Sequence, residues 1–344
     1  MSAPDCARTS RDGPTAVTVQ AGINIALVKY WGKRPGPGNL PAVGSLSLTL
    51  DAPGTRTTVA FDPTLDADVF TLNGEVDDIG PVGQVLDDVR AVVGLTTRAR
   101  VHSHNTVPTA AGLASSASGM AALGLAAWCA AGLPHTPDDP EPRLVDLVRR
   151  GSGSAPRSLL GGFARIDRER GRVHAVPTAP GFEVSLVIGL TVGGRKSTSS
   201  RLGMRQSAGS SPYYPAWVDT HEADMAAAAA AIAAGDFPAL GAVMEHSTMK
   251  MHACMLANQP PLRYWAPRTL VALDALGPLR EQGRAFATMD AGPHVKALCR
   301  REDEAVVAEV LRQALGDVLI ARPGRGARLV DEPVLPGDAR PERV

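Results

Sequence analysis

The chain has no excess of charge of either sign, because 35 lysines and arginines balance 35 aspartates and glutamates in 344 residues. A nucleic-acid-binding protein usually carries a strongly basic domain, so this balance argues against a nucleic-acid partner. It is compatible with a local basic pocket for a small anion. Aromatic residues are also scarce, at 4% of the chain, so we expect a core built mainly from alanine, valine and leucine.

Cysteines and long apolar runs are scarce as well. The four cysteines are Cys6, Cys129, Cys254 and Cys299. Their wide spacing excludes a zinc clip or a CxxC pair and favours reduced thiols in a cytoplasmic protein. Residues 1–14 contain no apolar run, which predicts no signal peptide. Residues 105–134 carry no charge, but their alanine, glycine, serine and threonine content predicts a loop and a buried helix instead of a membrane span.

Strand patterns dominate the first part of the chain. Runs rich in β-branched or alternating apolar residues predict strands at 15–20, 23–28, 45–50, 55–61, 69–72 and 98–102. Helical patterns occur at 81–93, in the alanine-rich segment that ends near 131, and at 142–150. We then expect a strand pair, 162–167 with 183–190, followed by a long polar loop at 191–214.

The later part of the chain is richer in helices. We expect helices at 216–234, 237–257, 267–282 and 302–315, and strands at 285–289, 295–298, 318–321 and 327–330. Because strands and helices do not alternate regularly, the pattern predicts an α+β fold and not a doubly wound parallel sheet. We place a domain boundary in the loop near 191, with an N-terminal domain at 15–190 and a C-terminal domain at 191–330. The polar ends, 1–14 and 331–344, are expected to be mobile.

The segment most specific for chemistry is Pro108–Gly119, with the sequence PTAAGLASSASG. Its small residues allow close approach to an anion, and Ser115 or Ser116 can cap the helix that follows. A helix N-terminus with free N–H groups binds phosphate well. The segment is not a Walker A loop, which needs a lysine after its second glycine. A glycine- and serine-rich turn before a closely packed helix explains the composition equally well.

A second segment, Asn24–Arg34, places Tyr30 and Trp31 between Lys29 and Lys33 at the end of a strand. Two cations beside rigid rings suit a phosphorylated substrate. The alternative is a solvated strand end.

Two further segments carry single charged residues in special positions. Arg157 follows the turn Gly151–Ser154, where hydroxyls and a guanidinium could clamp a carboxylate or phosphate. Asp290 ends an apolar strand before Ala-Gly-Pro, where it could act as a base or stabilise an anion. A helix end followed by a turn and a turn-initiating aspartate are the respective alternatives.

Together these four segments resemble the mevalonate diphosphate decarboxylases, a family within the GHMP kinase superfamily. Further similar positions are Pro41, Ser45–Leu50, Lys196–Arg201, Gly203, Met204, Ser211, Pro212, Tyr214–Trp217, Met251–Ala253, Met255 and Leu256. The similarity extends from about residue 17 to 315. It implies a two-domain GHMP-kinase-like fold: an N-terminal mixed sheet with helices, a C-terminal ferredoxin-like α/β sandwich, and an active-site cleft between them.

The resemblance implies that ATP phosphorylates the tertiary 3-hydroxyl of (R)-5-diphosphomevalonate. Loss of that phosphate with CO2 then gives isopentenyl diphosphate, in the mevalonate pathway of isoprenoid biosynthesis. In this reaction Asp290 would accept or polarise the hydroxyl proton, Arg157 would hold the carboxylate, and Asn24 would orient Arg157. Lys29 and Lys33 would face substrate or ATP phosphates.

The resemblance also implies binding residues. Those for substrate are Tyr30, Trp31, Lys33, Ser152, Ser154, Arg157, Ser200 and Arg201, the last two at the 5-diphosphate. Those for ATP are Ser103, Asn105, Pro108, Ala111, Gly112, Leu113, Ala114, Ser115, Ser116 and Ser118, with Ser115 also at the Mg²⁺ that accompanies ATP. No membrane or nucleic-acid partner is expected, and the family implies a cytoplasmic homodimer.

The chain departs from the family pattern at three places near these segments. His294 stands where asparagine is usual, Pro156 where cysteine is usual, and Val43 with Gly44 where hydroxyl or amide side chains are usual. A paralogue that acts on another 3-hydroxy acid is therefore an alternative. A kinase that phosphorylates without decarboxylating and a non-catalytic nucleotide sensor are two others. Asp290 together with Arg157 favours decarboxylation, because a simple kinase needs no carboxylate clamp.

Overall fold

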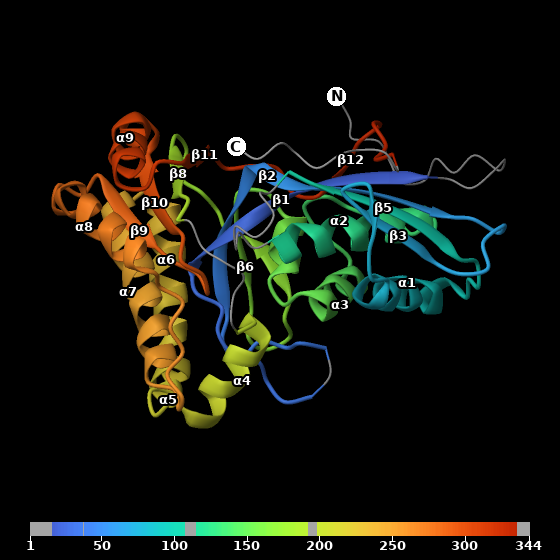
Figure 1. Cartoon of the computed structure of the whole chain (residues 1–344), viewed down its shortest axis with the longest axis horizontal. Helices are drawn as coiled ribbons and strands as arrows, with labels where there is room; N and C mark the ends of the chain where they lie inside the picture. Colours follow the sequence, from blue (N-terminus) through green and yellow to red (C-terminus); the bar gives the residue numbers. More distant parts are fainter. Residues whose placement is uncertain (1–15, 37, 107–114, 192–197, 336–344) are drawn as a thin grey trace.

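Two β-sheets organise the protein, one in each half (Figure 1). The computed structural model describes residues 16–36, 38–106, 115–191 and 198–335. The larger sheet has the order β12-β1-β2-β5-β3-β4, and β6 joins it by pairing with β2 and β7. Its strands are β1 (Val17–Val28), β2 (Ser45–Phe61), β3 (Val69–Leu72), β4 (Glu75–Val76), β5 (Ala99–Asn105), β6 (Phe163–Ile166), β7 (Val173–Ala175) and β12 (Arg328–Leu329). Only β3 and β5 run parallel among these pairs, so the sheet is mixed, as expected.

Three helices cover one face of the larger sheet. They are α1 (Gly80–Val93), α2 (Ser115–Ala130) and α3 (Pro142–Gly151), close to the predicted bounds. Helix α2 packs against β1 and β2, and its buried residues include Ala121, Ala122, Ala126 and Ala127. It also packs closely against α3, because a Cβ at Gly124 would overlap Val148 of that helix. This close packing fixes the N-terminal end of α2 near the end of β1.

The smaller sheet has the order β11-β8-β10-β9, and all its pairs are antiparallel. Its strands are β8 (Val184–Gly189), β9 (Ala285–Thr288), β10 (Val295–Arg300) and β11 (Val318–Ala321). Helices α6 (His221–Ala234) and α7 (Phe237–Leu256) share a core with one face, and α8 (Pro267–Glu281) and α9 (Glu304–Leu315) with the other. Taken in chain order, the strands are arranged 4-1-3-2, which is the ferredoxin-like arrangement predicted for this half.

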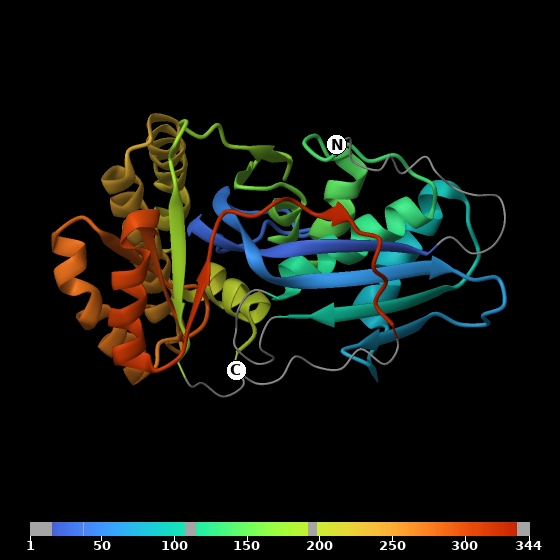
Figure 2. The same ribbon diagram turned by 90° about the horizontal axis from the view of Figure 1, so that it is seen from above.

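The predicted strand pair 162–167 with 183–190 is wrong. Strand β6 pairs with β2 and β7, whereas β8 lies in the smaller sheet between β10 and β11. The chain therefore changes sheets before Val184, upstream of the loop near 191. It later returns through β11 to β12, which pairs with β1 in the larger sheet (Figure 2).

Some expected element bounds also need correction. The predicted strands 15–20 and 23–28 form one strand, β1, and 45–50 and 55–61 form β2. Within the expected loop 191–214, residues 200–210 form helix α4 (Ser200–Ser210), and the expected helix 216–234 is divided into α5 (Tyr214–Asp219) and α6. The expected tail begins in an ordered contact, since the backbone N–H of Val334 donates to Thr58 Oγ1 at 2.8 Å.

Three of the four cysteines, Cys129, Cys254 and Cys299, lie in the described ranges. Cys254 and Cys299 are free and buried. Cys129 is disulfide-bonded, so the expectation of four reduced thiols is wrong there. Within the described ranges, no helix combines the length and apolar character needed to cross a membrane.

Candidate active site

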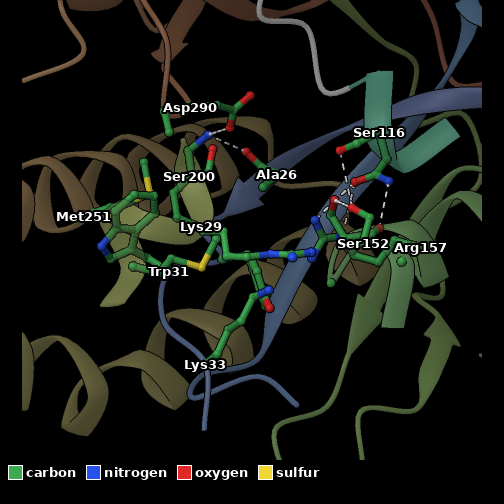
Figure 3. A pocket seen from close by; sticks show the side chains of 18 residues that line it. Ala26, Lys29, Trp31, Lys33, Ser116, Ser152, Arg157, Ser200, Met251 and Asp290 are labelled. Atoms are coloured by element: carbon green, nitrogen blue, oxygen red, sulfur yellow. Dashed lines mark hydrogen bonds and ion pairs between the residues drawn. The ribbon is translucent and has the colours of Figure 1, made fainter. Parts of the chain in front are cut away.

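Most of the predicted site residues meet at one cavity of about 310 Å³ between the two halves (Figure 3). The end of β1, the turn after α3 and the start of α2 contribute one part of its lining, and α4, α7 and the turn after β9 contribute the rest. The predicted residues that line it are Asn24, Lys29, Tyr30, Trp31, Lys33, Ser116, Ser152, Ser154, Arg157, Ser200, Arg201 and Asp290. The cavity is also lined by residues that were not among the predicted binding or catalytic residues, namely Ala26, Gly151, Gly153, Met204, Met251 and Ala291.

Asp290 lies between two buried lysines. Lys29 Nζ donates to Asp290 Oδ1 at 2.6 Å, and Lys296 Nζ donates to Oδ2 at 2.9 Å. Both lysine side chains are 1% exposed, whereas Asp290 keeps 26% exposure and lines the cavity. Lys29 is held from behind as well, because its backbone N–H donates to Ser247 Oγ of α7 at 3.0 Å. The carboxylate is thus fixed through both oxygens by groups from β1 and β10.

The pKa values in this cluster follow from burial and charge. Burial lowers the pKa of Lys29 to about 8, with Asp290 opposing the shift and Lys296 adding to it. Burial alone would raise the pKa of Asp290, but attraction and hydrogen bonds from Lys29 and Lys296 outweigh it and hold the pKa far below its usual range. Asp290 is therefore an anion throughout the physiological range and a strong hydrogen-bond acceptor.

Lys296 is a residue that the sequence analysis missed. It lies in β10, a strand whose remaining residues up to Cys299 are buried and apolar. A lysine in such a strand is a signal, because a buried ammonium needs an anionic partner. The sequence alone does not show that this partner is Asp290, six positions earlier.

Arg157 is buried at the other side of the cavity and held by neutral groups. Its Nε donates to Ser47 Oγ at 2.9 Å, and its Nη2 donates to Asn24 Oδ1 at 3.1 Å. Its Nη1 donates to Ser45 Oγ. Within the described ranges no carboxylate forms an ion pair with it, and each terminal nitrogen keeps one N–H that these bonds do not use.

An unpaired buried guanidinium beside a cavity fits an anionic ligand. Burial lowers the pKa of Arg157 to about 10, which leaves it cationic at neutral pH. Its two terminal N–H groups form a fork that matches the geometry of a carboxylate. Asn24 is oriented in turn, because its Nδ2 donates to Ser158 Oγ at 2.8 Å and to the Ser154 carbonyl at 3.1 Å.

Ser45 and Ser47 were similar to the family pattern, but their contact with Arg157 was not predicted from the sequence. They belong to the run Ser-Leu-Ser-Leu-Thr-Leu in β2. Successive side chains of a strand point to opposite faces, so the hydroxyls share one face and the leucines the other. This alternation is the sequence signal that could have placed both hydroxyls beside Arg157.

Three serines connect the turn after α3 with the first turn of α2. Ser152 Oγ lies 3.4 Å from Ser116 Oγ and 3.3 Å from Ser154 Oγ. Ser116 is exposed at the N-terminal end of α2, whose first turn contains no acidic residue. Free N–H groups and hydroxyls beside a cationic cavity suit the phosphates of a nucleotide.

A second group of cations lies at the Lys33 side of the cavity. Lys33 and Arg201 both line it, and Arg201 is in the first turn of α4 beside Ser200. Burial, followed by repulsion from Arg201 and Arg205, lowers the pKa of Lys33 to about 8. This concentration of positive charge favours a ligand with several negative charges.

Tyr30 and Trp31, the two aromatic residues of the segment Asn24–Arg34, have different surroundings. Trp31 Nε1 donates to Ser207 Oγ of α4 at 2.8 Å, which fastens this helix to the end of β1. Within the described ranges the buried hydroxyl of Tyr30 has no hydrogen-bond partner. Burial raises the pKa of Tyr30 to about 12, so its O–H is available as a donor to a ligand.

Some predicted ATP-binding residues do not line this cavity. Ser103 and Ser118 are buried, and their hydroxyls lie 2.8 Å from Thr57 Oγ1 and Thr55 Oγ1. Asn105 accepts from Thr55 Oγ1 at 2.6 Å. Ser115 begins α2, and Pro108, Ala111, Gly112, Leu113 and Ala114 lie outside the described residues. No group of three or more histidine, cysteine, aspartate or glutamate residues in the described ranges could hold a metal ion.

The four residues that depart from the family pattern, Val43, Gly44, Pro156 and His294, do not line the cavity. Val43 is buried in an apolar cluster, and Gly44 accepts a hydrogen bond from His221 Nε2 through its carbonyl at 2.9 Å. Pro156 lies in the first turn of the 3₁₀ helix Ala155–Leu159, where its missing N–H leaves no helical bond unmade. His294 is buried and accepts from the Thr191 N–H at 3.0 Å through Nδ1.

Known proteins are similar to the chain over nearly its whole length. Residues 21–176 match the Diphosphomevalonate decarboxylase-like N-terminal domain, and residues 186–321 match the Mevalonate 5-diphosphate decarboxylase C-terminal domain. A diphosphomevalonate decarboxylase of Gibberella zeae is 34% identical over 326 residues, which cover 87% of this chain and 84% of the relative.

Solved structures show the same similarity. One described as MDDEF in complex with MVAPP, AMPPCP and magnesium is 38% identical, with a TM-score of 0.85, and covers 93% of this chain and 100% of its own. A structure of the mevalonate diphosphate decarboxylase from Enterococcus faecalis is also 38% identical, with a TM-score of 0.83 and the same coverage. Sequence and structure together show that the chain belongs to the diphosphomevalonate decarboxylase family.

Proposed function

We propose that this protein catalyses the ATP-dependent decarboxylation of (R)-5-diphosphomevalonate to isopentenyl diphosphate. The γ-phosphoryl group of ATP passes to the oxygen of the tertiary 3-hydroxyl, which leaves ADP. The bond from C3 to that oxygen then breaks and phosphate departs. The bond to the carboxylate carbon breaks as well, and its electron pair forms the alkene while CO2 leaves.

The observation that carries this proposal is that Arg157 and Asp290 line the same cavity. Arg157 is a buried cation with a free fork for a carboxylate, and Asp290 is a fixed anion that can accept a hydrogen bond from an alcohol. A 3-hydroxy acid supplies both partners. The four residues that depart from the family pattern lie outside the cavity lining, which supports diphosphomevalonate as the substrate over another 3-hydroxy acid.

Asp290 acts in its charged form in this mechanism. Because Lys29 and Lys296 hold its pKa far below the usual range, it is a weak base but a strong acceptor. It orients the 3-hydroxyl by accepting its hydrogen bond, and as the phosphoryl group bonds to the oxygen the proton leaves along this hydrogen bond and passes to solvent water. Phosphoryl transfer depends mainly on positioning and on stabilisation of charge, so a fixed acceptor is sufficient.

Arg157 holds the carboxylate end of the substrate during both steps. Its guanidinium would accept the carboxylate with two parallel hydrogen bonds and so fix the bond that later breaks. The 5-diphosphate fits the Lys33, Ser200 and Arg201 part of the cavity, where the cations gather. Tyr30 also lines the cavity and adds a hydroxyl donor.

The first turn of α2, with Ser115 and Ser116, fits the phosphates of ATP. Mg²⁺ bound with ATP would neutralise charge on the transferred phosphoryl group. Ser116 reaches the same cavity as Asp290, so a nucleotide held there could meet the substrate hydroxyl. Ser115 is the residue that we propose for Mg²⁺ contact.

The direct test is to incubate the purified protein with ATP, Mg²⁺ and (R)-5-diphosphomevalonate and to follow ADP, phosphate and isopentenyl diphosphate together. We expect the three products in equal amounts. ADP without the alkene would show a kinase that stops after phosphorylation. Tight binding of ATP without any turnover would show that the chain acts on a different acid.

The pH dependence gives a second test. Lys29 and Lys33 both have a pKa lowered to about 8, so kcat/KM should fall as the pH rises through about 8 and both charges are lost. Asp290 has a strongly lowered pKa, so it should cause no loss of activity between pH 5 and 7, where Lys29 and Lys33 are still mainly protonated. A kcat/KM profile that stays flat up to about pH 10 would contradict this account of the cations.

Replacing Lys296 with methionine should lower kcat by about 10- to 100-fold, the equivalent of one hydrogen bond to a charged group. The apparent affinity for ATP should change little, because Lys296 acts through Asp290. Lys250→Met is the matched control: Lys250 pairs with Asp224 at 2.6 Å and does not line the cavity. If the two variants lose activity equally, Lys296 has no special role at Asp290.

Three broader features are also proposed. From the family resemblance we propose that the enzyme is cytoplasmic and that it forms a homodimer. Light scattering on the purified protein would test the homodimer. From the sheet pairing we propose a domain boundary between 176 and 184, revising the boundary expected near 191.

A further inference from the structure

Asn39 connects two parts of the cavity lining, although it is not itself a lining residue. Its Oδ1 accepts from Lys33 Nζ at 2.7 Å. Its Nδ2 donates to the carbonyl of Arg149 at 3.3 Å and to the carbonyl of Arg150. One amide therefore links the cationic part of the cavity to the end of α3, directly before the turn that carries Ser152.

The carbonyls that Asn39 reaches are special because they belong to the last turn of α3. The last four carbonyls of a helix have no partner within the helix and carry its partial negative charge. The NH2 group of Asn39 satisfies two of them and is polarised by them. Its oxygen consequently becomes a better acceptor for the Lys33 ammonium.

The surrounding loop holds Asn39 in this place. The backbone of Asn39 has φ +52°, a left-handed conformation that asparagine and glycine tolerate better than other residues. Arg149 Nη1 donates to the adjacent Gly38 carbonyl at 2.6 Å. Lys33 and Pro41 form an isolated β-bridge across the loop. The amide is thus held from both sides.

We propose that Asn39 is a positioning residue for Lys33, which it fixes as a cation facing the diphosphate end of the substrate. This inference rests on the proposed function, because the diphosphate of diphosphomevalonate is the anion that Lys33 would meet. It extends that function by assigning a role in substrate affinity to a residue outside the cavity lining.

The charges around Lys33 explain why an acceptor matters there. Arg201 and Arg205 of α4 face it and repel it. On the α3 side, Arg149 forms an ion pair with Asp146. Within the described ranges the acceptor that Lys33 meets is Asn39 Oδ1. Without this acceptor, Lys33 would lose its proton at a lower pH.

The test replaces Asn39 with glycine, which keeps the left-handed backbone and removes the amide. We expect the KM for diphosphomevalonate to rise about tenfold, the equivalent of one charged hydrogen bond, while kcat changes less than about twofold. The alkaline fall of 1/KM should move to lower pH. In a Lys33→Met background the same replacement should have almost no effect on KM, because Asn39 acts through Lys33.

Asn73→Gly is the matched control, since Asn73 also has φ +52° and lies in the turn between β3 and β4. It should leave the KM for diphosphomevalonate within about twofold of the original. An equal rise in KM from Asn39→Gly with and without Lys33, or no rise at all, would overturn the proposal.

A parallel measurement separates this inference from the proposed function. Calorimetric binding of inorganic diphosphate can be compared among the original protein, Asn39→Gly, Lys33→Met and the double variant. If the original protein forms no isopentenyl diphosphate, the proposed function fails, but weaker diphosphate binding in Asn39→Gly that depends on Lys33 would still support Asn39. Diphosphate binding that is the same in all four proteins would overturn the role of Asn39.

Discussion

Replacing Asp290 with asparagine is expected to lower kcat by about 10²–10⁴-fold, the range seen when a group that handles a reacting proton is removed. Asparagine keeps the shape of the side chain, but one of its two ends becomes an NH2 donor. That donor would face either Lys29 or Lys296, both of which are donors themselves. The substrate hydroxyl would then lose its fixed anionic acceptor. Steady-state kinetics with diphosphomevalonate measure the effect, and nucleotide binding should remain nearly unchanged.

The loss of Asp290 also leaves two buried ammoniums without their anion, and breaking a buried ion pair costs about 3–5 kcal/mol. A second variant therefore separates chemistry from folding. Asp290→Asn combined with Lys296→Met removes one charge of each sign, so thermal unfolding should return toward that of the original protein. Turnover should stay low. Recovery of turnover in the double variant, or near-normal kcat in Asp290→Asn, would remove Asp290 from the mechanism.

The main errors in predicting the fold from sequence concern glycines and chain adjacency. The predicted gaps between strands, at 21–22 and 51–54, contain Gly22 and Gly54, but the structure pairs these two glycines directly across β1 and β2. A Cβ at Gly22 would overlap the Leu50 carbonyl oxygen, so these glycines allow close approach of two backbones instead of ending the strands. Strands β6 and β8 are separated in sequence only by the short strand β7, yet pairing partners depend on the tertiary fold, and β6 and β8 join different sheets.

The residues that line the cavity could be predicted from the sequence more completely than the residues that contact them from behind. Lys29 and Asp290 were named from sequence because charged residues at the ends of apolar strands stand out, and Arg157 because it follows a turn rich in glycine and serine. Lys296 and Asn39 act through another residue, so only the three-dimensional arrangement shows their partners. Neither lies in a segment that the motif analysis singled out.

Replacing Arg157 with glutamine is the other change with a large expected effect. Glutamine can still donate a hydrogen bond, but it has no charge and no fork. We expect formation of isopentenyl diphosphate to slow by about 10²–10³-fold, as when a group that stabilises charge at a reacting centre is lost. The dissociation constant of ATP should change by less than about threefold, because no phosphate of the nucleotide is assigned to Arg157.

Arg157→Lys distinguishes charge from geometry. Lysine restores the cation but, as a point charge, cannot form two parallel hydrogen bonds to a carboxylate. If the fork fixes the bond that breaks, Arg157→Lys should recover substrate affinity more than kcat, measured as separate KM and kcat values. Buried cations without partners are costly, so Ser45, Ser47 and Asn24 would hold arginine here only if a ligand completes the site. Equal losses of ATP binding and product formation in Arg157→Gln would instead show a folding defect, whereas near-normal product formation in that variant would disprove the carboxylate clamp.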